Sequence, residues 1–420
     1  MNAKNLAVFV FVLVALLAAC GGGGGGGGGS GSGSGSSGGS PTSSISAVNN
    51  QSGLYAGVSN WVVGDLNGDG LDDVVFGGWN GPSNTANVTI FIQNTDGTLT
   101  EKTTALLDNS VYSGSQRLFI SDFDHDGRAD IWIPGFNDGC VGGCTANSVM
   151  LWGTTGKYTR QDFTDGLDSH GACLADMDGD GYLDMIVRGA YVFGQTTSGY
   201  YLNNHNRTFT FIPSSQVTAG ATCSVVKDPG SNNFAILQGN TAGVAGYSSY
   251  ISVLDSNLNL INAIGVTSHS NVANDLINSQ ALDVNGDGYI DFVMVFNQIA
   301  GGVAGVKEVW LNDGNGGFAY AYTIDSSTNN QYSIFKTNLA GQDYLMFDAP
   351  NGDAQLYKLN AGAWTLFGKS SFDTMATEAG GRPGVADWSI KTGLVYMNRN
   401  SNKIYMMQYV NGNFYTKLLQ

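Results

Sequence analysis

Charged residues are scarce in this chain of 420 residues. They make up 12% of it, and Asp and Glu outnumber Lys and Arg by 34 to 18. The net charge of −16 argues against nucleic-acid binding, which requires a basic face. Glu is almost absent, since 31 of the 34 acidic residues are Asp. Because Glu, Lys and Arg favour helices whereas Asp favours turns and metal loops, this balance argues against a mainly helical protein.

A hydrophobic run long enough to cross a membrane is also missing. The apolar stretch of residues 6–19 has fourteen residues, whereas a bilayer span needs about 20. We interpret residues 1–19 as a signal peptide. They end in Leu17-Ala18-Ala19 before Cys20, which resembles the lipobox of bacterial lipoproteins. The resemblance implies that Cys20 is lipidated, and Gly21 in place of Asp implies the outer membrane; an ordinary secretory signal is the alternative.

The chain after the signal divides into two parts. Residues 20–44 are Gly and Ser almost throughout and carry too few apolar side chains to fold, so we predict a disordered tether. We predict one folded domain over residues 45–420. The chain as a whole is 42% hydrophobic and 11% aromatic, which is enough to build a large core.

A repeat runs through this domain. Four segments with the pattern D-x-[DN]-x-D-G-x-x-D begin at Asp65, Asp122, Asp176 and Asp283. Degenerate copies of the pattern begin near residues 226, 335 and 387. The seven starts are about 54 residues apart. Polar turns that follow apolar runs recur with the same period. Periods of this length indicate propellers or solenoids.

Each repeat contains four short runs of β-branched and aromatic residues bounded by Gly, Asn and Asp, which is typical of strands. In the first repeat these runs are residues 61–64, 74–76, 88–92 and 99–102. No stretch beyond the signal shows a sustained helical period. We therefore predict an all-β fold, a seven-bladed β-propeller of four-stranded blades. A solenoid is the alternative.

The loops and their period resemble the FG-GAP/VCBS repeat family, the propeller type found at the N-terminus of integrin α chains and in many bacterial surface proteins. The likeness extends over residues 58–420. Phe76-Gly77 fits the start of the motif that names the family, but no Gly-Ala-Pro follows. In this family the face formed by the second-to-third strand loops and the links between blades is the usual binding surface.

The nine-residue loops have the chemistry of a calcium site. Positions one, three, five and nine supply carboxylate or amide oxygens, position seven offers its main-chain carbonyl, and Gly at position six permits the turn. We expect about four Ca²⁺ ions with a structural role; an Asx-rich turn without metal is the alternative. The predicted ligands are Asp65, Asn67, Asp69, Leu71, Asp73, Asp122, Asp124, Asp126, Arg128, Asp130, Asp176, Asp178, Asp180, Tyr182, Asp184, Asp283, Asn285, Asp287, Tyr289 and Asp291.

Four cysteines follow Cys20. Cys140 and Cys144 lie in one loop, and export from the cytoplasm predicts a disulfide between them. Cys173 and Cys223 occupy equivalent positions in neighbouring repeats. They either bridge two blades or are two buried thiols.

A recognition surface is predicted over blades one to five, on the face opposite the calcium loops. Its candidate residues are loop aromatics and amides: Trp79, Asn80, Phe136, Asn137, Tyr191, Asn297 and Gln298.

These patterns favour a lipid-anchored, calcium-stabilised binding or adhesion module at the bacterial envelope, with a polysaccharide or an envelope protein as partner. A glycan lyase or hydrolase on the same scaffold and a structural subunit of an envelope complex are the alternatives. We assign no catalytic residue: with three Glu in the chain a catalytic Glu pair is not expected, while Asp pairs stay open. The ligand, the side of the membrane and the oligomeric state also stay open.

Overall fold

The computed structural model describes most of the repeat region and a short strand before it. The described residues are 45–48, 58–78, 86–112, 114–115, 117–136, 148–163, 169–189, 197–218, 220, 222–228, 232–239, 249–269, 275–298, 303–325, 333–339, 341–348, 353–371, 393–410 and 413–418.

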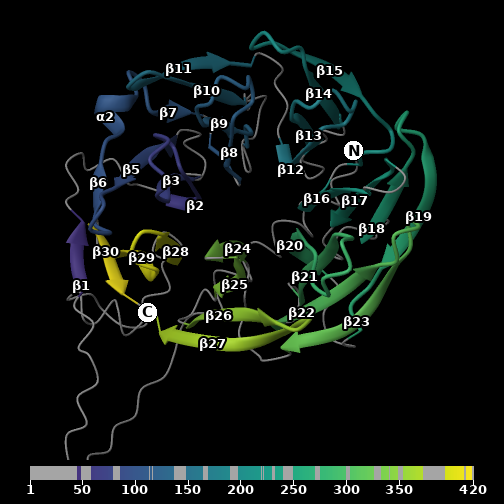
Figure 1. Ribbon diagram of the computed structural model, residues 1–420. Coiled ribbons are helices and arrows are strands. Elements are labelled where there is room, and N and C mark those ends of the chain that lie inside the picture. The colour runs from purple at the N-terminus through teal and green to yellow at the C-terminus, as the bar shows by residue number, and fades with distance from the viewer. Residues whose placement is uncertain are drawn as a thin grey trace, which may run out of the picture. The chain divides into compact units, whose positions relative to one another are not determined.

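Six four-stranded antiparallel sheets are each built from strands that follow one another along the chain (Figure 1). The first three contain β2 (Val58–Gly64), β3 (Asp73–Gly78), β5 (Thr89–Gln93) and β6 (Leu99–Glu101); β8 (Phe119–Ser121), β9 (Asp130–Ile133), β10 (Val149–Thr154) and β11 (Lys157–Asp162); and β12 (Ser169–Ala175), β13 (Asp184–Gly189), β14 (Gly199–Asn203) and β15 (Phe209–Pro213). The next three contain β16 (Thr222–Lys227), β17 (Phe234–Gly239), β18 (Ser249–Leu254) and β19 (Leu260–Val266); β20 (Asp275–Leu282), β21 (Asp291–Gln298), β22 (Val303–Asn312) and β23 (Phe318–Asp325); and β24 (Ser333–Leu339), β25 (Gln342–Asp348), β26 (Asp353–Asn360) and β27 (Ala363–Ser371).

A further four-stranded sheet joins the two ends of the domain. Its strands are β28 (Gly393–Asn398), β29 (Lys403–Val410), β30 (Asn413–Leu418) and β1 (Ile45–Val48). β1 runs antiparallel to β30, with Ile45 opposite Lys417. Residues 45–48 were predicted to lie in the domain, but every sheet was expected to consist of consecutive strands.

The sheets are arranged in a ring (Figure 1). In the six sheets of consecutive strands the first strand is innermost and the last outermost, and in the sheet that joins the two ends β28 is innermost and β1 outermost. The core lies between neighbouring sheets. Val75 and Ile90 of the first sheet pack with Ile131 and Leu151 of the second, and these side chains are at most 2% exposed. Burial of such a side chain stabilises the fold by about 1.5–3 kcal/mol, so the contacts between sheets hold the ring together.

Two small elements were not predicted. A one-turn helix, α2 (Thr103–Leu106), follows β6, and the strands β4 (Ala86–Asn87) and β7 (Val111–Tyr112) form a two-stranded sheet. The Thr103 hydroxyl fixes the helix by accepting a hydrogen bond from the Ile90 amide at 3.0 Å. Four residues are too few to show a helical period. No helix within the described residues has the length and apolar character that a membrane crossing requires.

The prediction of an all-β propeller with four-stranded blades is confirmed. In the first repeat, all four predicted strands overlap the observed ones. The local pattern succeeded because the second and third strands of these sheets are buried on both faces, which requires the short apolar runs seen in the sequence.

Candidate functional site

Each intact repeat loop connects the first strand of a sheet to the second. Residues 65–73, 122–130, 176–184 and 283–291 therefore occupy equivalent places in four sheets. The loop turns sharply at position six, where Gly70 has φ +81° and Gly127 has φ +84°. L-residues with a side chain rarely adopt this conformation.

The position-one aspartate organises the inside of each loop. The two carboxylate oxygens of Asp65 each accept a hydrogen bond at 2.7 Å, from the amides of Gly68 and Gly70. Asp283 makes the corresponding pair of bonds at 2.7 and 3.0 Å. The same carboxylate pattern thus shapes loops that lie in different sheets.

The position-nine aspartate anchors the loop to the sheet. Asp130 Oδ2 accepts a hydrogen bond from Phe123 N at 2.9 Å, and Oδ1 accepts one from Gly153 N at 2.7 Å. Asp184 does the same with Met177 N and Asn203 N. One carboxylate therefore links the start of the loop to the end of the third strand.

These anchoring carboxylates are fully buried, at 0% exposure. Burial raises the pKa of Asp73 and Asp130 to about 7 and that of Asp184 to about 6, although two backbone hydrogen bonds oppose the rise in each case. Nearby loop carboxylates add to the rise. A bound cation would favour the ionised form of each group.

Two of the loops bring three carboxylates together. Oxygens of Asp122, Asp124 and Asp130 lie within 4.8 Å of one another, and so do those of Asp176, Asp178 and Asp184. The two other loops carry Asn at position three, namely Asn67 and Asn285. An all-oxygen donor set of this kind fits a hard divalent cation.

Cationic side chains of neighbouring sheets contact these two loops. Arg207, in the turn between β14 and β15, donates from Nε to Asp124 Oδ2 at 2.6 Å, and its guanidinium lies 5.4 Å from the centre of the Trp152 ring. Lys227 lies 3.6 Å from Asp176. These partners are more than 40 residues from the loops they contact, so no local motif could have revealed them.

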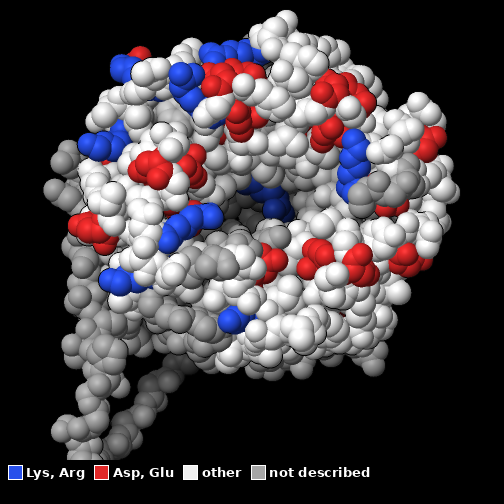
Figure 2. Space-filling view, viewed as in Figure 1, with Lys and Arg blue, Asp and Glu red and all other residues white. Residues whose placement is uncertain are grey.

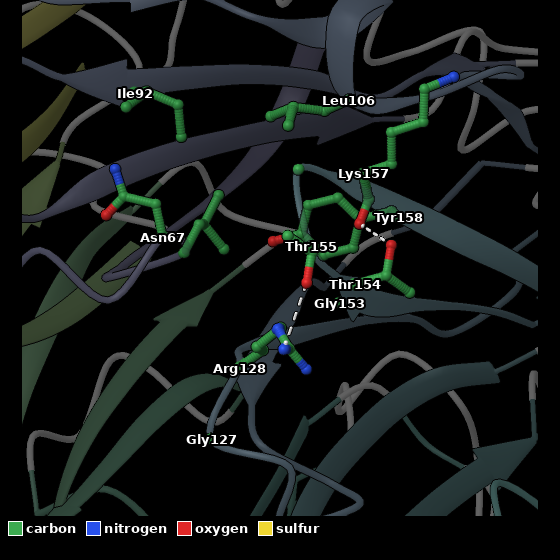
Figure 3. Close-up of a pocket in the computed structure, with 12 residues that line it drawn as sticks. Asn67, Ile92, Leu106, Gly127, Arg128, Gly153, Thr154, Thr155, Lys157 and Tyr158 are labelled. Atoms are coloured by element: carbon green, nitrogen blue, oxygen red, sulfur yellow. Dashed lines mark hydrogen bonds between the residues drawn. The ribbon is translucent and has the colours of Figure 1, made fainter.

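A pocket of about 310 Å³ lies beside the first two loops (Figure 3). It is lined by Asn67 and Arg128, from loop positions three and seven, and by Ile92, Leu106 and Tyr158. Tyr158 is 8% exposed, and its hydroxyl has no hydrogen-bond partner among the described residues. The volume is at the lower end for ligand sites.

One of the two cysteine pairs is described, and it forms a disulfide. Cys173 of β12 is bonded to Cys223 of β16, with a Cα–Cα distance of 5.4 Å. The bridge joins the innermost strands of neighbouring sheets, which was one of the two alternatives for this pair. Cys140 and Cys144 lie outside the described residues.

The candidate ligand face is corrected at one position. Phe136 was expected on the surface, but it is 1% exposed. Its amide donates to Gly114 O at 3.0 Å, which fixes the chain directly after β9 with this side chain inside. Trp79, Asn80, Asn137 and Tyr191 lie outside the described residues. Asn297 and Gln298 are at the end of β21, and the structure describes only their backbone.

The comparison with protein families agrees with the geometry of the loops. Residues 65–133, which hold the first two loops, match the FG-GAP-like repeat family. This stretch is an FG-GAP-like repeat. It runs from the first predicted metal ligand of the first sheet into β9 of the second.

A curated protein and several solved structures are similar to the chain. Cartilage acidic protein 1 of Xenopus tropicalis is 30% identical over 134 residues, which are 29% of this chain and 19% of that protein. The chain thus spans about a fifth of that relative. The crystal structure of BBS1N in complex with ARL6DN matches with a TM-score of 0.51 and 9% identity over 88% of this chain and 93% of BBS1N. The Dos1 propeller matches with a TM-score of 0.48 and 12% identity over 87% and 78%. At such identities the BBS1N match shows the fold alone.

Proposed function

We propose that this chain is a calcium-stabilised binding module, held at the bacterial outer membrane by a lipid on Cys20. The observation that carries the proposal is the pair of three-carboxylate clusters set in loops of one geometry. A propeller supplies a rigid scaffold, and its loops are where binding surfaces are built.

We propose calcium as the ion, with about four sites. The side-chain ligands would come from positions one, three, five and nine, and position seven would give its main-chain carbonyl. The negative charge of the loops supports a divalent cation, because several carboxylates in one loop repel each other without one. The ion would hold the turn and would take no part in a reaction.

A calcium titration of ion-free protein tests this proposal. We expect calcium to raise the thermal unfolding midpoint, since it binds only the folded loops. Magnesium should raise it less, because Mg²⁺ demands a stricter octahedral geometry. An unfolding midpoint that is the same in chelator and in millimolar calcium would refute the proposal.

The propeller is proposed to have seven blades, with the sheet of β28, β29, β30 and β1 as the closing blade. The pairing of β1 with β30 supports this count. Deletion of residues 45–48 should then lower the unfolding midpoint, while deletion of an equal number of residues from 30–40 should not. Equal midpoints for the two deletions would contradict closure by β1.

Binding is proposed rather than catalysis. Among the described residues, Glu308 is buried at 0% exposure. It accepts hydrogen bonds from the Ser268 hydroxyl, the His269 amide and the Trp310 indole. A glycosidase needs carboxylates that can reach its substrate, whereas the Glu308 carboxylate is buried and hydrogen-bonded within the protein.

We propose an envelope protein as the partner, because the solved propeller with a TM-score of 0.51 is seen in a complex with a protein. A polysaccharide is the second candidate. Cross-linking on intact cells followed by mass spectrometry tests the first, and a glycan array with and without chelator tests the second. If the chain bound neither an envelope protein nor a polysaccharide, the proposed binding function would be refuted.

The lipid anchor can be tested separately. Cells that are fed a clickable palmitate analogue should label the wild-type protein, and Cys20→Ala should remove the label and release the protein from the membrane fraction. Membrane association that persists in Cys20→Ala would refute lipid anchoring at this residue.

A further inference from the structure

A single arginine reaches across the middle of the ring. Arg117 lies just before β8, the innermost strand of the second sheet, and Asn278 lies in β20, the innermost strand of the fifth. The Arg117 guanidinium donates from Nη1 to Asn278 Oδ1 at 3.5 Å. Two sheets lie between these strands along the chain, so the contact is made across the central hollow. Figure 2 shows this hollow, with Lys or Arg atoms inside it.

No carboxylate forms an ion pair with Arg117 among the residues that the structure describes. Among the described residues its side chain makes one hydrogen bond, the 3.5 Å contact with Asn278 Oδ1. Burial of a charge without a counter-ion is costly. A guanidinium with five donors thus has donors left over in a largely enclosed place.

A second arginine lies close by. Arg188 is 0% exposed, and its guanidinium donates to the carbonyl oxygens of Thr218 at 2.8 Å and of Gly239 at 3.0 Å. Burial lowers the pKa of Arg117 to about 10 and that of Arg188 to about 9, and the charge of Arg117 contributes to the latter. Both groups keep their charge at neutral pH. The hollow therefore contains positive charge in a chain whose net charge is −16.

The acidic loops and Arg117 lie at opposite ends of the innermost strands. The acidic loops follow the C-terminal ends of the innermost strands, whereas Arg117 precedes the start of one. In Figure 2 acidic side chains (red) lie around the rim of the hollow, and Lys or Arg atoms (blue) lie deep inside it. An anion that entered from the Arg117 end would avoid the carboxylates of the loops.

We propose that the central hollow binds an oxyanion, a carboxylate or a phosphate group, through the Arg117 guanidinium with Asn278 beside it. The planar guanidinium offers two parallel donors that match either group. This inference rests on the proposed function, because the oxyanion would be the acidic group of the partner. It places recognition at the end of the ring away from the metal loops.

Isothermal titration calorimetry on the calcium-loaded full chain in detergent, at constant ionic strength, tests the site. The probes are D-glucuronate, inorganic phosphate and D-glucose, which is a neutral sugar of the same ring size as glucuronate. We expect at least one of the two anions to bind and glucose not to bind. Binding of glucuronate alone indicates a carboxylate as the source, and binding of phosphate alone indicates a phosphate-bearing partner.

Arg117→Gln should weaken anion binding by about tenfold or more, since it removes charge-assisted hydrogen bonds. Arg160→Gln is the matched control: Arg160 lies on the outermost strand of the same sheet and pairs with Asp162 at the surface, so anion binding should be unchanged. Arg117→Lys keeps the charge without the planar fork, should bind more weakly than wild type, and serves as the readout if the Gln variant does not fold.

Two results would overturn the inference. One is that neither anion binds to wild-type protein. The other is that Arg117→Gln, with a wild-type unfolding midpoint, binds the anions as wild type does. A partner that is captured equally well by Arg117→Gln would leave the proposed function standing and would remove only the oxyanion site.

Discussion

Removal of the Cys173–Cys223 bridge should destabilise the propeller by several kcal/mol. The two cysteines are 50 residues apart in the chain and join β12 to β16. The loop-closure relation gives an entropy of about 14 cal/mol/K for a closed loop of this length, or about 4 kcal/mol at 25 °C. The two cysteine residues are also buried, at 6% and 4% exposure, so the double change to Ala removes packing in addition.

The assay is chemical unfolding of the Cys173→Ala/Cys223→Ala variant and of wild type, both without reductant. A mass measurement on the wild type should show two hydrogens fewer than the reduced chain for each bridge present. The Cys140→Ala/Cys144→Ala variant is the comparison, because a bridge between residues only four apart would contribute about 2 kcal/mol by the same relation. If the first variant loses less stability than the second, the bridge does not act by restraining the unfolded chain.

Three shorter predictions concern the loops and the pocket. Asp184→Asn should lower the free energy of unfolding in calcium by about 1–3 kcal/mol, because a buried backbone donor loses its acceptor. Asp178→Asn should only weaken calcium binding, since two other loops carry Asn at this position. In ion-free protein the folded-state pKa values of Asp73 and Asp130, about 7, lie above the ordinary 3.8. The free energy of unfolding should therefore fall as pH rises from about 4 to 7, and calcium should oppose this fall. An unfolding midpoint that rises with pH in chelator would contradict the raised pKa values. Tyr158→Phe should raise the free energy of unfolding by about 1 kcal/mol, because it removes a buried hydroxyl that lacks a described partner; a lower stability would mean that the hydroxyl is satisfied.

The fold could be predicted because its information is local and repeated. Each sheet carries its own strand pattern, and the loop motif marks the turn between its first two strands. The closing sheet could not be foreseen in the same way. The four residues of β1 carry no motif, and their partner β30 lies at the opposite end of the chain.

The candidate site was predictable only where its residues are close in sequence. The carboxylates of each loop lie within nine residues of one another, so their spacing reveals them. Burial depends on tertiary contacts, which is why Phe136 was wrongly expected at the surface. Arg117 lacks a local signal as well, because its contact with Asn278 spans 161 residues.

The hydrogen bonds of the position-nine aspartates bear on what calcium can do for the fold. Asp130 ties the start of its loop to the end of the third strand through two backbone amides, and Asp122 holds the turn from inside through the amide of Gly127. These bonds need no ion, so the loop has its shape before calcium binds. In metal domains that lack such bonds, removal of the ion unfolds the chain. Here a chelator should lower the unfolding midpoint while leaving the far-ultraviolet circular dichroism spectrum at 20 °C unchanged. Loss of the β-sheet signal at that temperature would show that the ion, and not the carboxylate-to-amide bonds, holds the loops.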